Sequence, residues 1–285
     1  MTDDHTDLSV LLPVYAGVTA PHLAEALESI AAQTLPAREV VIVEDGPLTP
    51  EQHEVLDAFA GGREGVVRVV LPVNGGAGVA NQAGLEAATG AWIAKADADD
   101  VLVPTRFERQ VEALRETGAD LCGSAMWEFD DDPDRPVRLR VNPLTHDGIA
   151  RRMRFNNPIN HPTTVYRRGL ALEVGGYPTM RFMQDYDLFA RLLAGGARMT
   201  NLEEPLVRFR AGDTMHRRRS ARGYLALELE LQRRLRSYGV IGPVRMARNL
   251  LVRWTFRMLP QQAIRHTYAR FLSSPVAPSD AAATR

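Results

Sequence analysis

The first hundred residues alternate short runs of aliphatic and β-branched residues with segments whose apolar residues recur at helical spacing. Each short run predicts a strand, and each longer periodic segment predicts a helix. Because neighbouring parallel strands need a crossover connection, this order favours an α/β fold with a doubly wound sheet. We expect strands at residues 8–14, 39–43, 66–71 and 91–96 and helices at residues 21–32, 50–59 and 78–88, with Thr49 as the N-cap of the second helix.

The second half of the chain is less regular. A loop with two prolines occupies residues 156–162. Together the two halves predict one large folded unit over residues 1–215, followed by an appendage. We expect helices at residues 106–117, 148–155 and 185–193 and strands at residues 120–129, 163–166 and 202–210.

The composition is that of an ordinary soluble protein, since 45% of the 285 residues are hydrophobic and 24% are charged. The formal net charge of -1 points to no partner. Cys122 is the single cysteine, which excludes an intrachain disulfide, and we expect a buried structural thiol there. The chain begins with polar residues unlike a signal peptide, and no apolar run is long enough for a membrane span, so we expect a cytoplasmic protein.

Residues 216–285 form a basic extension. Between residues 217 and 272 the chain has thirteen arginines and two glutamates, with leucines and aromatic residues among them. A helical segment of this kind suits an anionic membrane surface, with Trp254 and Phe256 at the interface. It suits equally a solvated helical pair that packs on the preceding domain. No nucleic-acid-binding motif accompanies the charge, and the last residues are predicted to be disordered.

Acidic residues follow two of the predicted strands. Glu44 and Asp45 come after one, and Asp97-Ala98-Asp99 after another. Ligands of doubly wound sheets bind beyond the carboxyl ends of the strands. In an extended stretch the carboxylates of Asp97 and Asp99 would point the same way and could bind a hard ion such as Mg²⁺ or Mn²⁺. Taken alone, the triplet fits a solvated turn or helix N-cap as well, and both interpretations stay open at this point.

The motifs taken together resemble the family 2 inverting glycosyltransferases with the GT-A fold, and more narrowly the bacterial capsule and exopolysaccharide members. The resemblance covers residues 8–210 and rests on the order and spacing of short motifs. They lie at residues 9–15, 29–34, 41–47, 74–84, 97–107, 123–129, 143–146, 160–163, 175–177, 184–188 and 204–207.

This resemblance implies a GT-A catalytic domain with a mixed sheet at residues 1–215, a donor half at about 8–105 and an acceptor half at about 106–215. It implies metal-dependent transfer of a sugar from a UDP-, dTDP- or GDP-linked donor to a glycan or polyprenyl-linked acceptor. Polymer-building members often use lipid-linked acceptors, which would favour peripheral contact of the extension with the inner face of the cell membrane.

The resemblance also assigns residues to the donor. Pro13, Val14 and Tyr15, with Glu44 or Asp45, would hold the nucleotide base. Lys95, Asp97 and Ala98 would contact the rest of the nucleotide, with Asp97 shared between the ribose and the ion and Asp99 as the main metal ligand. Asn81 would reach the ribose or diphosphate, or else would be a buried amide that caps a helix.

Asp185, beside Gln184 at a helix start, is the implied general base, because an inverting transfer needs a carboxylate to deprotonate the acceptor hydroxyl. The helix dipole offers a simpler reason for an acid at that position. Gln184, His161 and Trp127 would contact the acceptor or the diphosphate, although a structural hydrogen bond explains His161 and a core position explains Trp127 as well. Arg208, Arg210 and His216 would cover the diphosphate, or would be ordinary exposed basic residues.

Two other functions compete with transfer. A sugar-nucleotide pyrophosphorylase would need a glycine-rich loop with arginine and lysine near the N-terminus, and residues 13–17 offer neither. An inactive binding module would be marked by a lost metal pair or a lost base, whereas Asp97, Asp99 and Asp185 are all present.

Overall fold

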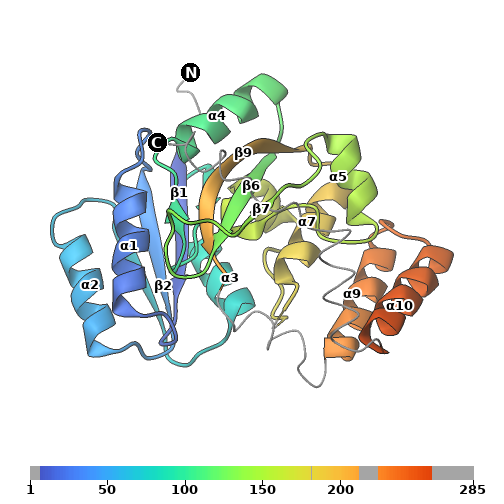
Figure 1. Ribbon diagram of the computed structural model, residues 1–285, viewed down its shortest axis with the longest axis horizontal. Coiled ribbons are helices and arrows are strands. Elements are labelled where there is room, and N and C mark those ends of the chain that lie inside the picture. Colours follow the sequence, from blue (N-terminus) through green and yellow to red (C-terminus); the bar gives the residue numbers. More distant parts are fainter. Residues whose placement is uncertain (1–6, 181, 212–223, 259–285) are drawn as a thin grey trace.

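The computed structural model describes residues 7–180, 182–211 and 224–258 (Figure 1). Four parallel strands form the first part of its sheet, in the order β3-β2-β1-β4. The strands are β1 (Leu8–Val14), β2 (Glu39–Asp45), β3 (Val66–Leu71) and β4 (Trp92–Lys95), and the crossovers are α1 (Ala20–Ala31), α2 (Pro50–Ala60) and α3 (Ala77–Ala87). The predicted doubly wound order is therefore confirmed.

Alternation along β1 assigns the helices to the two faces of the sheet. Leu8, Val10, Leu12 and Val14 pack in one core with residues of α1, α2 and α4 (Arg106–Thr117). Leu11 packs in a second core with residues of α3. Thr49 caps α2 as predicted, since its hydroxyl accepts from the Gln52 N–H at 3.3 Å while the Gln52 side chain accepts from the Thr49 N–H at 2.9 Å.

The second half completes the sheet with strands of both directions. Beyond β4 the order is β8-β6-β9-β5, and β7 pairs with β6 outside this path. In this second half, β6 and β9 form the parallel pair, whereas β8, β5 and β7 pair antiparallel with their neighbours. The elements are β5 (Val101–Leu102), β6 (Leu121–Phe129), β7 (Arg138–Arg140), α5 (His146–Met153), β8 (Val165–Arg167), α6 (Arg168–Glu173), α7 (Gln184–Ala194) and β9 (Met199–Arg210).

The main differences from prediction concern short elements. β5, β7 and α6 were not predicted, because two to six residues carry too little periodicity to be recognised. The strand expected at residues 163–166 begins at Val165, and a 3-10 helix, η2 (His161–Thr163), precedes it. Pro162 lies inside that turn, where its missing N–H costs nothing.

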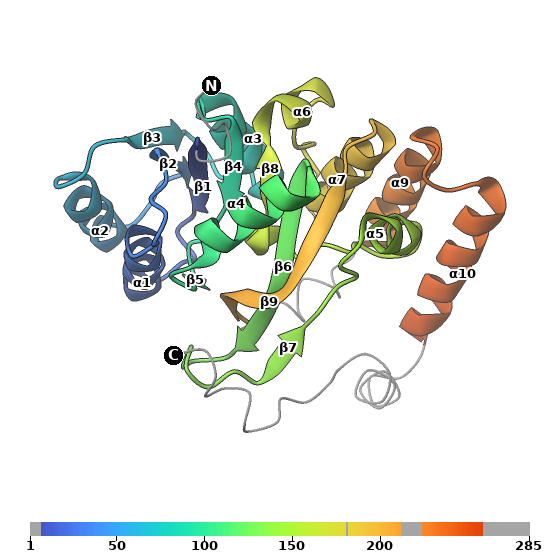
Figure 2. The same ribbon diagram turned by 90° about the horizontal axis from the view of Figure 1, so that it is seen from above.

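Two helices of the basic extension pack on the preceding part of the chain. α9 (Tyr224–Ser237) and α10 (Pro243–Met258) lie at the end of the molecule opposite α2 (Figures 1 and 2). Leu231, Leu235 and Ile241 are buried in the same core as residues of α7. Among the described residues, no helix combines the length and apolarity needed to cross a membrane. The domain boundary predicted at residue 215 and the predicted disordered tail lie outside the described residues.

Candidate functional site

A cavity of about 770 Å³ lies at the carboxyl ends of β1, β2 and β4. Both halves of the chain line it, so residues far apart in sequence meet there. The first half contributes Pro13, Val14, Tyr15, Asp45, Asn81, Asp97, Ala98 and Asp99 of the predicted residues, and the second contributes His161, Gln184 and Asp185.

The Asp97-Ala98-Asp99 triplet forms a turn after β4, closed by a 3.3 Å hydrogen bond from the Asp100 N–H to the Asp97 carbonyl. The expectation of an extended stretch with Ala98 turned aside is therefore wrong, because β4 ends at Lys95. The turn nevertheless places Asp97 and Asp99 on the cavity wall, together with Ala98.

Buried cations support this turn from below. The Lys95 ammonium lies 2.5 Å from a carboxylate oxygen of Asp97 and is 1% exposed. Burial alone would raise the pKa of the Asp97 carboxyl, but the charge of Lys95 and its hydrogen bond outweigh burial and lower that pKa. Arg106 donates to the Lys95 carbonyl at 2.8 Å. Lys95 does not line the cavity, where we expected it to contact the donor. Its ammonium pairs with Asp97 instead.

The pKa values of the Asp99 and Asp100 carboxyls are raised, whereas that of Asp97 is lowered. Burial and the neighbouring Asp97 charge raise the pKa of Asp99, and burial with repulsion from both neighbours raises the pKa of Asp100 well above its usual range. Asp100 accepts from the Arg210 N–H at 2.9 Å, while its second carboxylate oxygen is buried without a hydrogen bond among the described residues. This crowding of carboxylates favours a nearby cation.

The donor set fits a divalent ion held partly by substrate. Among the described residues, no group of three or more His, Cys, Asp or Glu side chains is arranged to hold a metal by itself. Mg²⁺ and Mn²⁺ sites in phosphate chemistry commonly use one or two carboxylates and complete their shell with phosphate oxygens and water. Asp97 and Asp99 supply that number, so the residues present fit the predicted ion.

Asp185 lies in the first turn of α7, at the cavity wall. The side-chain amide of Asn157 donates to its carboxylate at 2.8 Å, and the carbonyl of the same amide accepts from the Ile159 N–H at 3.2 Å. Met183, the N-cap of α7, has a φ of 63° and is the only non-glycine residue with positive φ in the described ranges. Such strain costs of order 1–3 kcal/mol and is tolerated where function fixes the geometry.

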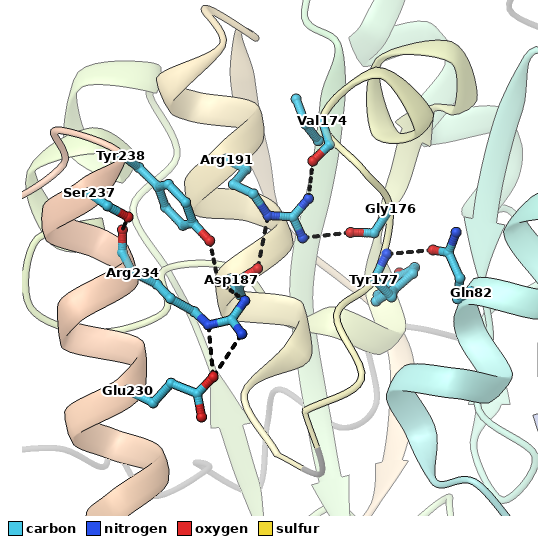
Figure 3. A network of polar contacts seen from close by, with 10 residues as sticks. All are labelled: Gln82, Val174, Gly176, Tyr177, Asp187, Arg191, Glu230, Arg234, Ser237 and Tyr238. Atoms are coloured by element: carbon cyan, nitrogen blue, oxygen red, sulfur yellow. Dashed lines mark hydrogen bonds and ion pairs between the residues drawn. The ribbon is translucent and has the colours of Figure 1, made fainter.

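His161 lies at the start of η2, with its Nε2 2.9 Å from the Tyr177 hydroxyl, which in turn lies 3.1 Å from the Tyr166 hydroxyl. Burial and the Lys95 charge lower the pKa of His161, which favours a neutral ring beside the cavity. A partly buried polar network joins the same region to the C-terminal helices (Figure 3). It links Gln82 to the Tyr177 N–H, Arg191 to the Gly176 carbonyl, and Asp187 to Arg191 and Tyr238.

Of the two acids that end β2, only Asp45 lines the cavity. Its two carboxylate oxygens accept from the N–H groups of Gly75 and Gly76 at 2.7 and 3.0 Å. Glu44 is 2% exposed and forms a 2.7 Å ion pair with Arg68 instead. Asn81 lies inside α3, where its buried amide donates to the Ala77 carbonyl at 2.7 Å, so it does not cap the helix as the alternative expected, and it lines the cavity.

Three other predicted residues lie off the cavity wall. Trp127 is 7% exposed within β6. Arg208 pairs with Asp134 at 3.2 Å, and Arg210 pairs with Glu25 at 2.6 Å while it donates to the Asp99 carbonyl at 3.1 Å. Arg210 therefore supports the acidic turn in this structure and does not reach the cavity. His216 lies outside the described residues.

Several lining residues escaped sequence reasoning. The loop at residues 156–160 was recognised only as a loop, although its asparagines were its clearest polar signal. The short strand β7 carries no local signal strong enough to place its side chains. The missed lining residues include Arg138, Arg140, Asn142, Arg152, Asn156, Asn157 and Asn160.

The sequence is similar to those of known glycosyltransferases. Residues 9–175 match the family described as Glycosyl transferase family 2. The chain is 33% identical over 263 residues to the amylovoran biosynthesis glycosyltransferase AmsE of Erwinia amylovora, covering 92% of this chain and 98% of that protein. It is 27% identical over 273 residues to the UDP-Gal:alpha-D-GlcNAc-diphosphoundecaprenol beta-1,3-galactosyltransferase of Escherichia coli, covering 95% and 98%.

Solved structures agree on the fold. TarS residues 1–349 from S. aureus in complex with UDP-GlcNAc has a TM-score of 0.66 at 19% identity, over 93% of this chain and 73% of that one. The mannosyltransferase PcManGT of Pyrobaculum calidifontis in complex with GDP-Man and Mn²⁺ has a TM-score of 0.56 at 18% identity, over 85% and 67%. The predicted GT-A fold is confirmed by these similarities.

Proposed function

Because the chain belongs to glycosyl transferase family 2, we propose that it transfers a sugar, with inversion, from a nucleotide-diphospho-sugar to a hydroxyl of a growing surface polysaccharide. One observation carries the proposal: Asp185 and the Asp97–Asp99 turn line the same cavity from opposite halves of the chain. An inverting transfer needs a proton acceptor on one side of the sugar and support for the leaving diphosphate on the other.

The donor would lie against the first half of the chain. Asp45 and the backbone around Pro13, Val14 and Tyr15 form the wall beyond β1 and β2, where nucleotides bind in doubly wound sheets. Asp97 and Asp99 would hold a divalent ion, which when bound neutralises negative charge on the diphosphate leaving group. Lys95 keeps Asp97 charged and oriented for this task.

Asp185 would act as the general base. Its carboxylate takes the proton of the acceptor hydroxyl while that oxygen attacks the anomeric carbon and the bond to the nucleoside diphosphate breaks. Asn157 orients the carboxylate through its 2.8 Å hydrogen bond. Two relatives support a glycan acceptor: one is named for biosynthesis of the polysaccharide amylovoran, and the other for transfer to a sugar on diphosphoundecaprenol.

The decisive experiment combines binding and turnover. UDP-, dTDP- and GDP-sugars are screened by thermal shift with Mn²⁺, and the stabilising donor is used in a radiolabelled transfer assay. Asp185→Asn should retain the thermal shift and lose transfer, by about 10²-fold or more if the base is essential. Near-wild-type turnover of this variant would refute the assignment. Failure of the wild type to release nucleoside diphosphate from any donor would favour the inactive-module alternative.

The extension would also bring the enzyme to the inner face of the membrane. On α10, Val244, Leu251 and Trp254 are 83%, 60% and 53% exposed, and their spacing places them on one helical face. Arg248 is exposed one helical turn from Val244 and Leu251. An apolar stripe beside arginine matches the contact that helices make with anionic lipid.

Flotation with anionic and with neutral vesicles tests this contact. The wild type should float with anionic vesicles, and Leu251→Glu with Trp254→Glu should not. Leu225→Glu, which changes an exposed leucine of α9, is the matched control. Equal flotation of all three proteins, or no flotation of the wild type, would refute the membrane contact and favour the solvated helical pair.

A further inference from the structure

The charge of the cavity wall changes from one end to the other. Asp45, Asp97 and Asp99 line the end formed by the first half of the chain. Arg138, Arg140 and Arg152 line the part formed by β7 and α5. Figure 2 places β7 and α5 across the sheet from β2 and α2, with β6 and β9 between them.

Two of these arginines are held in place by a buried acid. Arg138 and Arg140 alternate along β7, so they share one face of that strand. Their guanidinium groups lie 3.3 and 3.2 Å from the carboxylate of Glu128, which is 2% exposed. The Arg138 side chain remains 44% exposed. A guanidinium has five N–H donors, and one carboxylate contact leaves donors of Arg138 for a ligand.

The third arginine belongs to the segment that orients Asp185. Arg152 is exposed in the last turn of α5, and Asn156 and Asn157 follow it on the cavity wall. Asn157 donates to the Asp185 carboxylate at 2.8 Å. The three arginines therefore line the cavity from the same half of the chain as the proposed base, whereas the acidic turn comes from the other half.

We propose that Arg138, Arg140 and Arg152 bind a phosphate or diphosphate group that the acceptor carries next to its reacting sugar. This inference rests on the proposed function. Arginine pairs with phosphate through two parallel hydrogen bonds, which gives direction as well as attraction. A neutral glycan would leave the exposed donors of Arg138 and Arg152 to water, whereas an anionic aglycone would fix the sugar hydroxyl in front of Asp185.

The reaction leaves the acceptor phosphate unchanged. The acceptor hydroxyl oxygen forms the new bond to the anomeric carbon, its proton passes to Asp185, and the nucleoside diphosphate leaves with the electrons of the broken bond. The arginines take no part in these bond changes and act only in binding and orientation.

The acceptor sugar is chosen from a small panel. The test then compares two forms of that sugar, an alkyl diphosphate and a neutral alkyl glycoside. The wild type should show a KM about tenfold lower for the diphosphate form. Arg138→Gln and Arg152→Gln should each raise that KM about tenfold, with the donor KM within about twofold of wild type. Arg151→Gln, which changes the exposed neighbour of Arg152 outside the cavity wall, is the matched control.

Equal use of the two acceptor forms, or a rise in the donor KM alone, would overturn the proposal. Calorimetric binding of decyl diphosphate to the enzyme saturated with nucleoside diphosphate and Mn²⁺ decides the matter without turnover. The wild type should bind it, and the two variants should bind it about tenfold more weakly. Absent binding, or equal affinity in all proteins, would overturn the proposal even if no panel sugar is accepted.

A second pair of acceptors identifies the source of the phosphate. One is a polyprenyl diphosphate sugar in vesicles, which represents a lipid carrier, and the other is a soluble phosphodiester-linked glycan fragment, which represents a polymer. Faster transfer to one of them identifies the source. Metal-dependent release of nucleoside diphosphate by the wild type without acceptor tests the proposed function alone. Release without preference for a phosphorylated acceptor refutes only the arginine site.

Discussion

The Tyr238 hydroxyl, just beyond α9, donates a 2.9 Å hydrogen bond to the Asp187 carboxylate on α7, which is fully buried (Figure 3). Arg191 donates to the same carboxylate at 2.8 Å and also contacts the carbonyls of Val174 and Gly176. Asp185 lies two residues before Asp187 in the first turn of α7. The C-terminal helices are therefore tied to the helix that presents the proposed base.

Asp187→Asn should destabilise the fold strongly. Removing one partner of a buried ion pair costs about 3–5 kcal/mol, because it leaves a buried charge unpaired. Tyr238→Phe should cost about 1 kcal/mol, the worth of one hydrogen bond. Urea unfolding measures both, with Arg233→Gln as a control at an exposed position of α9. Equal unfolding midpoints for wild type and Asp187→Asn would contradict the central place of this carboxylate.

Asn157→Ala should lower kcat more than it changes the KM of the donor. The substitution removes the 2.8 Å hydrogen bond that orients Asp185 and leaves the acidic turn untouched. Misplacement of a reacting group by about 1 Å can cost about 10²-fold in rate. Steady-state transfer kinetics measure the split. A rise in donor KM with unchanged kcat would show that Asn157 binds the donor instead.

Gly78→Ala should destabilise the protein, whereas Gly62→Ala should not. A Cβ at Gly78 would lie 2.2 Å from the Pro178 carbonyl oxygen, and a Cβ at Gly62 would meet nothing within 4 Å. Overpacking of this kind typically costs about 1–3 kcal/mol. Thermal or urea unfolding compares the two variants. Loss of stability in Gly78→Ala alone would agree with a close approach of α3 to the Pro178 carbonyl, and equal stability of the two variants would contradict it.

The parallel half of the fold was predictable because each of its elements is long enough to show its own period. The acids that end β2 and those that follow β4 were predictable as a group, because parallel strands bring their carboxyl ends to one edge of the sheet. The roles within the group were not. Whether Glu44 or Asp45 faces the cavity depends on Arg68 of the neighbouring strand, which holds Glu44 at 2.7 Å.

The acceptor side depended on contacts between distant segments. Arg138 and Arg140 reach the cavity because β7 pairs with β6 and Glu128 holds both side chains, and neither relation leaves a local pattern. The same holds for Lys95, whose place in the sequence suggested the donor. Lys95 lies on β4, which has a strand on each side, so its side chain is buried. Its ammonium pairs with Asp97.

Glu39 gives the fold a pH-dependent element far from the reaction. One of its carboxylate oxygens accepts from the Ser9 hydroxyl at 2.5 Å, the Thr89 N–H at 2.6 Å and the Gly90 N–H at 3.3 Å. Burial raises the pKa of this carboxyl, but these hydrogen bonds outweigh it and leave the pKa below the ordinary value. A group with a lowered pKa in the folded state stabilises the fold above its unfolded pKa, and this stability is lost as the pH falls through the folded pKa.

Glu39→Gln should therefore be less stable than wild type at pH 7, by about 1–3 kcal/mol, because an amide accepts these hydrogen bonds less strongly. The difference should narrow as the pH falls below about 4.5, where the carboxyl of the unfolded wild-type chain starts to take up its proton, and it should not widen there. Urea unfolding of both proteins at pH 7 and at pH 4 measures the two differences. A gap that stays constant between the two pH values would mean that the Glu39 charge contributes nothing to the stability of this strand junction.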